Sequence, residues 1–434
     1  MTIIDKIFYS WRHTAMNTCK IVLPKSLIVS ILILLFIFSE AFGQIHFTGF
    51  AGLAGNIGTE EGEDKAQLTA DTFFAGQLDL FNIVLLRAGA TVHTGNLFSD
   101  IFVNTVDAQF TLDELSVTAH FPCSHVTRYI SVFAGEYESI GSDVFLRRHF
   151  GILPFASRLS ENLAGTIDTN IYPFSNLGAS YILKLKTPQA FGLYFYAGKR
   201  QLQQANGENL LPPSDTTEDE KILRGNVDLR FAGVFPFITV DFSAGLGFPI
   251  EKDEEKASMS LNQRLEFHTG LSTVIGNTHT VSLFLQFGIT KIILNPLDDQ
   301  KSLSLSDLYF WIEPRFKIEF MNFHFTLFNL PKETIHDMFY LSGSLGANLA
   351  VFANNIYAGP LTLTTGAHLT ISTQNIDLAE MNNVSSDNMS FRISPFIEIP
   401  FFEGTFLSRF SIDFMEFEKM HTSIKFTLGY KTKL

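Results

Sequence analysis

Three arginines lie close together in the one stretch of this chain that lacks strand-like alternation. Arg147 and Arg148 follow three apolar residues, and Arg158 comes shortly after them. A guanidinium group presents a planar fork that matches a carboxylate, and apolar side chains beside it would hold a hydrocarbon tail. The pattern therefore predicts a site for a fatty acid. Its predicted ligand-binding residues are Arg147, Arg148, Arg158, Phe145, Leu146, Phe150 and Phe155.

No enzyme motif accompanies these residues. The segment GLYFYAGK, residues 192–199, has one residue too many for a phosphate-binding P-loop and lacks the hydroxyl that should follow. The chain contains no G-x-S-x-G, H-E-x-x-H or G-x-G-x-x-G sequence, and its histidines are scattered singly. We therefore expect no enzyme, no metal site and no cofactor. A Ser-His pair formed across strands stays open as an alternative.

The elements that must position the arginines are strands. Apolar and polar residues alternate over many segments of near ten residues, the length of a tilted membrane strand. These segments are 47–53, 72–81, 84–93, 114–121, 129–137, 178–186, 190–198, 226–231, 238–246, 265–273, 281–289, 308–318, 323–330, 341–351, 361–371, 391–399, 406–414 and 424–434. Short turns alternate with longer polar loops, of which 199–221 is the longest. The pattern predicts an all-β, antiparallel transmembrane β-barrel, for which we estimate about 14 strands.

The last alternating segment, 424–434, predicts how the barrel closes. Its apolar face carries Phe426, Leu428, Tyr430 and Leu434, and the residues between them are polar or small. An apolar strand with a free edge invites aggregation in a soluble sheet, whereas a closed barrel has no edge. We therefore expect this strand to pair with the one near Phe47 and to face lipid.

The arginines belong to a predicted helical or irregular insert, residues 142–176, between two strands. Residues 142–151 begin with a helix N-cap candidate and end in Gly, and residues 154–165 are similar. A connection this long and this apolar is either a plug in the lumen or an outer cap. We expect it to gate the passage of a ligand if it is a plug.

A second interpretation of the arginines is that they pair with acids of the lumen. The strand pattern directs both signs of charge inward, and a mixed lumen normally satisfies itself by pairing. The predicted inward acids and bases are Asp228, Asp241, Glu266, Glu313, Glu398, Arg87, Arg230, Arg264, Arg315 and Arg392.

The N-terminal region predicts export. Lys20 and Lys25 precede the apolar run 27–38, which is shorter than the roughly 17–25 residues that span a bilayer. Ala41 and Gly43 are small residues two apart, so we expect a signal peptide, 1–43, to be cleaved between Gly43 and Gln44. Met16 is an alternative start, and an uncleaved membrane anchor is the alternative to cleavage.

Composition narrows the classes of function. Without residues 1–43 the chain carries 27 Lys and Arg against 42 Asp and Glu, a net charge of −15, which argues against nucleic acid as a partner. Only Cys123 then remains, so neither an intramolecular disulfide nor a cysteine-rich zinc site is expected. Phenylalanine is abundant, at 45 residues in the whole chain, as in an outward aromatic band that faces lipid.

Two Phe-rich hairpins and the insert carry a resemblance. The segments are YFWIEPRF (309–316) and FRISPF (391–396), together with the terminal strand. In these features residues 44–434 resemble the outer-membrane barrels of spirochaetes, among them treponemal proteins likened to the FadL family of long-chain fatty acid transporters. The resemblance implies a 14-stranded barrel in the outer membrane that takes up hydrophobic compounds.

The predicted function is an outer-membrane channel for hydrophobic molecules, with long-chain fatty acids as the expected ligand. A general diffusion porin and a surface adhesin or antigen are the alternatives. The expected partners are membrane lipid, the barrel assembly machinery and, through the outer loops, host molecules.

Overall fold

The computed structural model describes residues 45–59, 66–81, 83–97, 108–152, 157–160, 177–199, 223–250, 265–294, 303, 305–331, 338–359, 361–373, 382, 384–385, 388–415 and 423–434. The barrel belongs to the compact unit Phe47–Leu434. The predicted signal peptide, its cleavage site at Gly43 and Gln44, and most of the loop 199–221 lie outside the described residues.

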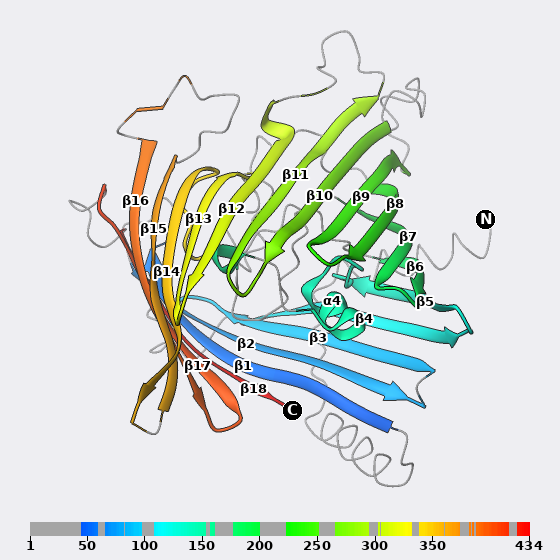
Figure 1. Cartoon of the computed structure of the whole chain (residues 1–434), viewed down its shortest axis with the longest axis horizontal. Coiled ribbons are helices and arrows are strands. Elements are labelled where there is room, and N and C mark those ends of the chain that lie inside the picture. Colours follow the sequence, from blue (N-terminus) through cyan, green and yellow to red (C-terminus); the bar gives the residue numbers. More distant parts are fainter. Residues whose placement is uncertain are drawn as a thin grey trace. The chain divides into compact units, whose positions relative to one another are not determined.

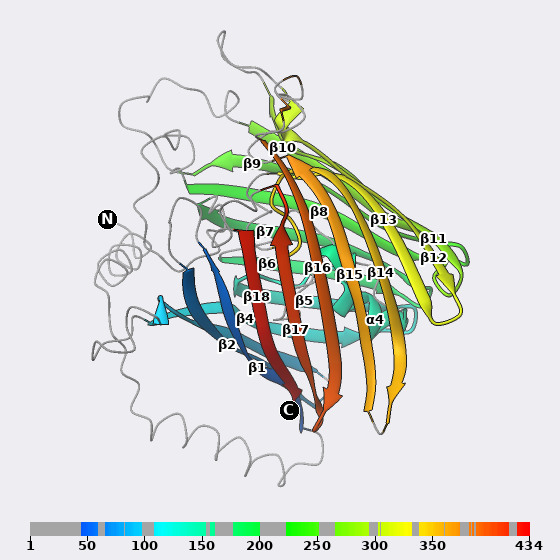
Figure 2. The ribbon, with the colours of Figure 1, turned by 90° about the vertical axis from the view of Figure 1, so that its left-hand side faces the viewer.

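Eighteen antiparallel strands form one sheet in the described part of the chain (Figure 1, Figure 2). Strands β1 to β9 are Ile45–Thr59, Ala66–Leu80, Val84–Thr94, Ala108–Pro122, Val126–Gly135, Leu177–Leu185, Gln189–Lys199, Leu223–Val234 and Ile238–Pro249. Strands β10 to β18 are Leu265–Asn277, Val281–Leu294, Leu308–Ile318, Met321–Asn329, Leu345–Ala358, Leu361–Thr373, Met389–Phe401, Gly404–Asp413 and Ile424–Lys433. Each strand pairs with its neighbours in sequence, and β1 also pairs with β18, so the sheet closes into a barrel.

Three helices are described besides the strands. They are α4 (Asp143–Phe150) and the 3-10 turns η1 (Arg158–Ser160) and η4 (Leu305–Asp307). Among the described residues, no helix is both long and apolar enough to span a membrane.

The estimate of about 14 strands is wrong. Every alternating segment of the sequence contributes to a strand of its own, and tight connections such as Glu319 and Phe320 between β12 and β13 leave room for all of them. Hairpins this tight need no more than two residues between strands. The barrel is therefore wider than the resemblance implied.

The closing pair forms as expected. Strand β18 pairs with β1 from Phe50↔Lys433 to Ile57↔Phe426, and the side chain of Thr427 donates a hydrogen bond to Asn56 Oδ1 at 2.8 Å. Leu428 is exposed on the outer face, whereas Phe426 and Tyr430 are half-buried there. Beyond β18, the Leu434 N–H donates to the Gly49 carbonyl at 2.9 Å.

Burial along the strands is inverted relative to a soluble protein. In β8, Asp228 and Arg230 are 0% exposed, while Leu229 between them is 54% exposed. Strand β4 alternates in the same way, with Ser116 and Thr118 buried on either side of the exposed Val117. Because neighbours in a strand point to opposite faces, the polar face lines the lumen and the apolar face is the outer surface.

Two boundaries differ from the sequence pattern. The predicted strand 341–351 begins only at Leu345, because residues 338–344 turn into the lumen, where Leu341 is 1% exposed. The same predicted strand ends at Val351, whereas β14 continues to Ala358 through a bulge, after which the pairing with β15 resumes at Ile356. Alternation alone cannot distinguish a strand from a short apolar segment that packs inward.

Barrel closure is testable by crosslinking across the seam between β1 and β18. In a background with Cys19→Ser and Cys123→Ser, the pair Asn56→Cys and Thr427→Cys should form a disulfide, since the two residues are direct cross-strand partners. Oxidised protein should then show altered migration in SDS gels that reverts on reduction. The control pair Asn56→Cys and Lys431→Cys lies four residues out of register, and equal crosslinking there would contradict the closure.

Candidate functional site

The insert between β5 and β6 is described in residues 136–152 and 157–160, and it begins with α4. The Ser142 side chain accepts a hydrogen bond from the Phe145 N–H at 3.1 Å, and Gly151 ends the helix in the left-handed conformation with φ 68°. Both caps match the prediction, because a short polar side chain at the N-cap and a glycine after the last turn satisfy helix ends locally. Basic residues in the last turn, among them Arg147 and Arg148, also favour this end of the helix.

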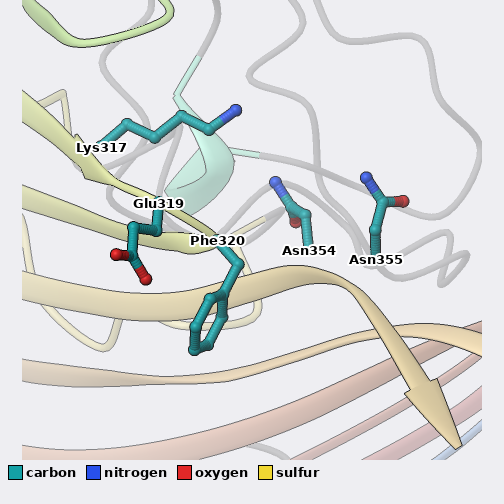
Figure 3. Close-up of a pocket in the computed structure, with 5 residues that line it drawn as sticks. All are labelled: Lys317, Glu319, Phe320, Asn354 and Asn355. Atoms are coloured by element: carbon teal, nitrogen blue, oxygen red, sulfur yellow. The ribbon is translucent and has the colours of Figure 1, made fainter.

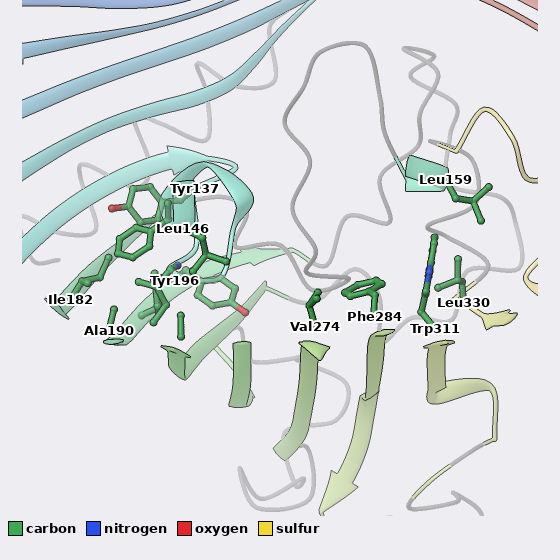
Figure 4. Packing of buried hydrophobic residues seen from close by; sticks show 14 of the residues in the cluster. Tyr137, Leu146, Leu159, Ile182, Ala190, Tyr196, Val274, Phe284, Trp311 and Leu330 are labelled. Atoms are coloured by element: carbon green, nitrogen blue, oxygen red, sulfur yellow. Dashed lines mark hydrogen bonds between the residues drawn. The ribbon is translucent and has the colours of Figure 1, made fainter. Parts of the chain in front are cut away.

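The α4 half of the insert packs closely against the inner wall. Phe145 and Leu146 are buried in an apolar cluster with wall residues such as Tyr196 and Ile182 (Figure 4). The Ile140 N–H donates to the Tyr194 hydroxyl in β7 at 3.1 Å. At Gly141 the backbone lies so close to Asp241 of β9 that an added Cβ would be 2.0 Å from the carboxylate.

An ion-pair chain fixes the start of the insert to the wall. Glu138 pairs with Arg87 of β3 on one side and with Arg148 of α4, at 3.3 Å, on the other. Arg87 also lies 4.0 Å from Glu114 of β4, and its Nε donates to Gln77 of β2 at 3.0 Å. The acid of the insert therefore neutralises a wall arginine.

The second half of the insert, which we call the foot (residues 157–160), contacts the opposite part of the ring. The Ser157 hydroxyl donates to Glu313 Oε2 in β12 at 2.5 Å. Leu159 is buried beside Trp311 and Leu330 (Figure 4). The described parts of the insert therefore contact inward-facing residues of β3, β7, β9 and β12.

Glu313 is the most heavily bonded acid of this region and is 0% exposed. Its carboxylate accepts hydrogen bonds from Arg315 Nε at 2.7 Å, Thr326 Oγ1 at 2.8 Å and Trp311 Nε1 at 3.0 Å, besides the bond from Ser157. His324 Nδ1 lies 3.3 Å away. A buried carboxylate is tolerated only with such a set of partners.

Arg158 occupies a defined seat in the wall. Its guanidinium lies 4.7 Å from the ring centroid of Phe352 in β14 and 4.6 Å from that of Phe396 in β16. The same group pairs with the carboxylate of Glu398, also in β16. We call Phe352, Phe396 and Glu398 the Arg158 seat.

A second segment that also enters the lumen, residues 338–344, was predicted in part as the start of the strand 341–351. The Tyr340 ring stacks on His368 with centroids 3.9 Å apart, and the guanidinium of Arg409 lies 5.3 Å from the same ring. Ser342 hydrogen-bonds to Ser372 and Ser390. The apolar run Phe339, Tyr340 and Leu341 inside a connection was the available signal.

The predicted ligand-binding residues do not gather into one site. Arg148 of α4 and Arg158 of the foot each pair with a carboxylate of the protein, and Arg147 is exposed. Phe145 and Leu146 are buried against the wall and Phe150 is half-buried at its edge, while Phe155 lies outside the described residues. Binding of a fatty acid by these residues stays a prediction.

The prediction that the lumen charges pair is confirmed for several groups. Arg224 and Lys291 both contact Glu266, at 3.0 and 3.1 Å, and Arg392 lies 3.4 Å from Asp413. Asp228 pairs with His268 at 3.0 Å. Arg264 lies outside the described residues.

A surface pocket of about 360 Å³ lies at the tight turn between β12 and β13. Figure 3 shows its lining residues, Lys317, Glu319, Phe320, Asn354 and Asn355, around the turn between β12 and β13 and the bulge of β14. None of the predicted ligand-binding residues lines it. Within the described residues, no group of three or more His, Cys, Asp or Glu side chains could hold a metal ion.

Comparisons with known proteins find similarity in structure only. No protein-family model and no curated protein sequence matches the chain. A structure described as "Asymmetric conductivity of engineered proteins" and a mutant porin of Rh. blastica each align with 7% identity and a TM-score of 0.43, over 90% of this chain and 100% of theirs. The OmpF of Salmonella typhi in complex with daunomycin aligns with 11% identity and a TM-score of 0.38, over 90% and 97%. Likeness at this level carries no inference on function.

Docking of α4 should depend on the absence of a side chain at position 141. Gly141→Ala should displace the insert from Asp241, because the methyl group would overlap the carboxylate. We expect limited proteolysis to cut within 136–152 at least several-fold faster. Gly55→Ala is the matched control, since an added Cβ there meets nothing within 4 Å. Equal protection of the two variants would contradict the contact.

Docking should also weaken in acid through His149. Burial, with Lys184, Arg87 and His120 nearby, lowers the pKa of His149 from 6.5 to about 4. The undocked chain therefore binds a proton that the docked helix excludes as the pH falls from 6.5 towards 4, and stability is lost in that window by no more than about 3 kcal/mol. Hydrogen exchange of the α4 amides at pH 7 and pH 5 measures this loss.

His149→Gln removes the titrating group from the helix. The acid-induced rise in α4 exchange should therefore become smaller in this variant. His279→Gln, in an exposed turn, is the control and should behave like the unmodified chain. An unchanged pH response of His149→Gln would refute the assignment.

Proposed function

We propose that this chain forms a diffusion channel for small polar solutes in a bacterial outer membrane, with the insert as the element that narrows it. The observation that carries the proposal is the inverted burial of the strands, in which Asp228 and Arg230 face inward and Leu229 faces outward. An apolar outer surface on a closed barrel suits lipid, which offers no hydrogen-bond partners to the backbone. A wall of charged and hydroxyl side chains suits water-soluble cargo.

Export follows from the same proposal. We infer that the predicted signal peptide, 1–43, directs the chain across the inner membrane and that the barrel assembly machinery inserts it. Strand β18 pairs with both β17 and β1, so it is the strand whose insertion completes the ring. We propose a channel and not an enzyme.

Transport of long-chain fatty acids has less support. The apolar residues meant for the lipid tail, Phe145 and Leu146, are buried against the wall by the insert's own packing. Arg158, meant for the head group, holds Glu398. A surface adhesin would act through outer loops such as 199–221, and no described contact favours that function over a channel.

Conductance in planar lipid bilayers tests the channel. The purified barrel should show steady single-channel currents, and deletion of 142–165 should raise the conductance several-fold, because it removes α4 and the foot without removing a strand. Arg147→Gln is the matched control, since this exposed side chain anchors nothing in the described wall. Heat-modifiable migration in SDS gels checks that each barrel is folded.

Two results would overturn the proposal. Absence of current from a folded barrel, together with fatty acid retained through purification and detected by mass spectrometry, would favour a lipid carrier. Unchanged conductance after the deletion would mean that the insert does not narrow the path.

A further inference from the structure

We propose that the Arg158 seat is a binding site for guanidinium-type organic cations, which Arg158 fills as an internal ligand. The inference rests on the proposed channel function in one respect: solutes in the lumen reach the seat and compete with Arg158 for it. The site itself consists of Phe352, Phe396 and Glu398, all of which belong to the wall.

The geometry selects a flat cation. Two aromatic faces lie within 4.7 Å of the guanidinium carbon, inside the range in which a cation is attracted by a ring. A delocalised guanidinium is planar and weakly hydrated, so it stacks on rings more readily than a strongly hydrated ammonium. The Glu398 carboxylate completes the seat, since it accepts a charge-assisted hydrogen bond from the guanidinium.

The seat does not depend on the insert for its shape. Phe352 and Phe396 lie on β14 and β16, and their ring centroids are 6.4 Å apart. Gly366 of β15 is the cross-strand partner of both residues and lies between them in the sheet, and His368 of the same strand packs against Phe396 at 5.6 Å. The rings are therefore held by the strand ladder, whereas Arg158 is held by a short 3-10 turn.

Exchange of Arg158 for a solute cation leaves Glu398 paired, because one guanidinium replaces another beside its carboxylate. The bond from Ser157 would be lost with the foot, but Glu313 keeps its bonds to Arg315, Trp311 and Thr326. Release of the foot therefore leaves no buried carboxylate without a hydrogen-bond partner.

Binding of methylguanidinium to the purified barrel in detergent tests the site, measured by isothermal titration calorimetry. Arg158→Ala empties the seat and should bind the probe at least tenfold more tightly than the unmodified chain. Adding Glu398→Gln to that variant should weaken binding at least tenfold. Urea, a planar neutral analogue, should not bind, and Arg147→Ala should bind no better than the unmodified chain.

Channel conductance gives a second measurement with methylguanidinium. Arg158→Ala should raise the conductance, and millimolar methylguanidinium should lower it again, whereas urea should not. If Arg158→Ala does not fold, as judged by heat-modifiable migration, Arg158→Gln replaces it in both measurements.

Equal binding by the Arg158 and Arg147 variants, or binding that survives Glu398→Gln, would overturn the site. If methylguanidinium binds but no variant carries current, the channel function is refuted and the binding site is supported. The two proposals can therefore fail independently.

Discussion

Closure of the hydrogen-bond ladder is the constraint on which the rest of this structure depends. An apolar surrounding supplies no partners for backbone N–H and C=O groups, so a sheet in lipid can have no free edge. Here the condition is met by the eight register pairs between β1 and β18, which join the two ends of an 18-stranded meander. Every strand is then paired on both sides, and the barrel can expose an apolar outer face without inviting further strands.

Closure places the polar face inside, and the insert completes the charge balance there. Much of the wall pairs with itself, as Arg224 does with Glu266. Two wall groups instead take partners from the insert: Arg87 pairs with Glu138, and Glu398 pairs with Arg158. Besides its apolar contacts, the insert therefore carries charges opposite to those of the wall residues that it contacts.

Local patterns in the sequence predicted most of the fold. Alternation located the strands, because the two faces of each strand differ in chemistry, and the caps at Ser142 and Gly151 predicted α4 because they act within one turn. The strand count was wrong, and the inward turn at 338–344 was missed. Alternation continues through Leu341 although the chain leaves the sheet there, since an inward-packed segment presents the same residue types.

The partners of the site residues were beyond such reasoning. Glu398 is 240 positions from Arg158, and Glu313 is 156 from Ser157. Nothing within either segment indicates which of many lumen acids will be reached, because that choice depends on strand register around the ring. The alternative prediction, that arginines of the insert pair with inward acids, is confirmed for Arg158. The sequence could not indicate that its partner would be Glu398.

The two halves of the insert are held by different kinds of interaction, and this difference bears on how the lumen opens. The α4 half uses backbone contacts, at Ile140 and Gly141, and apolar burial, as at Leu146. These are lost only together, when the helix leaves the wall. The foot combines the burial of Leu159 with the contacts of Ser157 and Arg158, polar side chains for which water or a solute can substitute. Motion that widens the path should therefore begin at the foot, while α4 stays in place as its anchor.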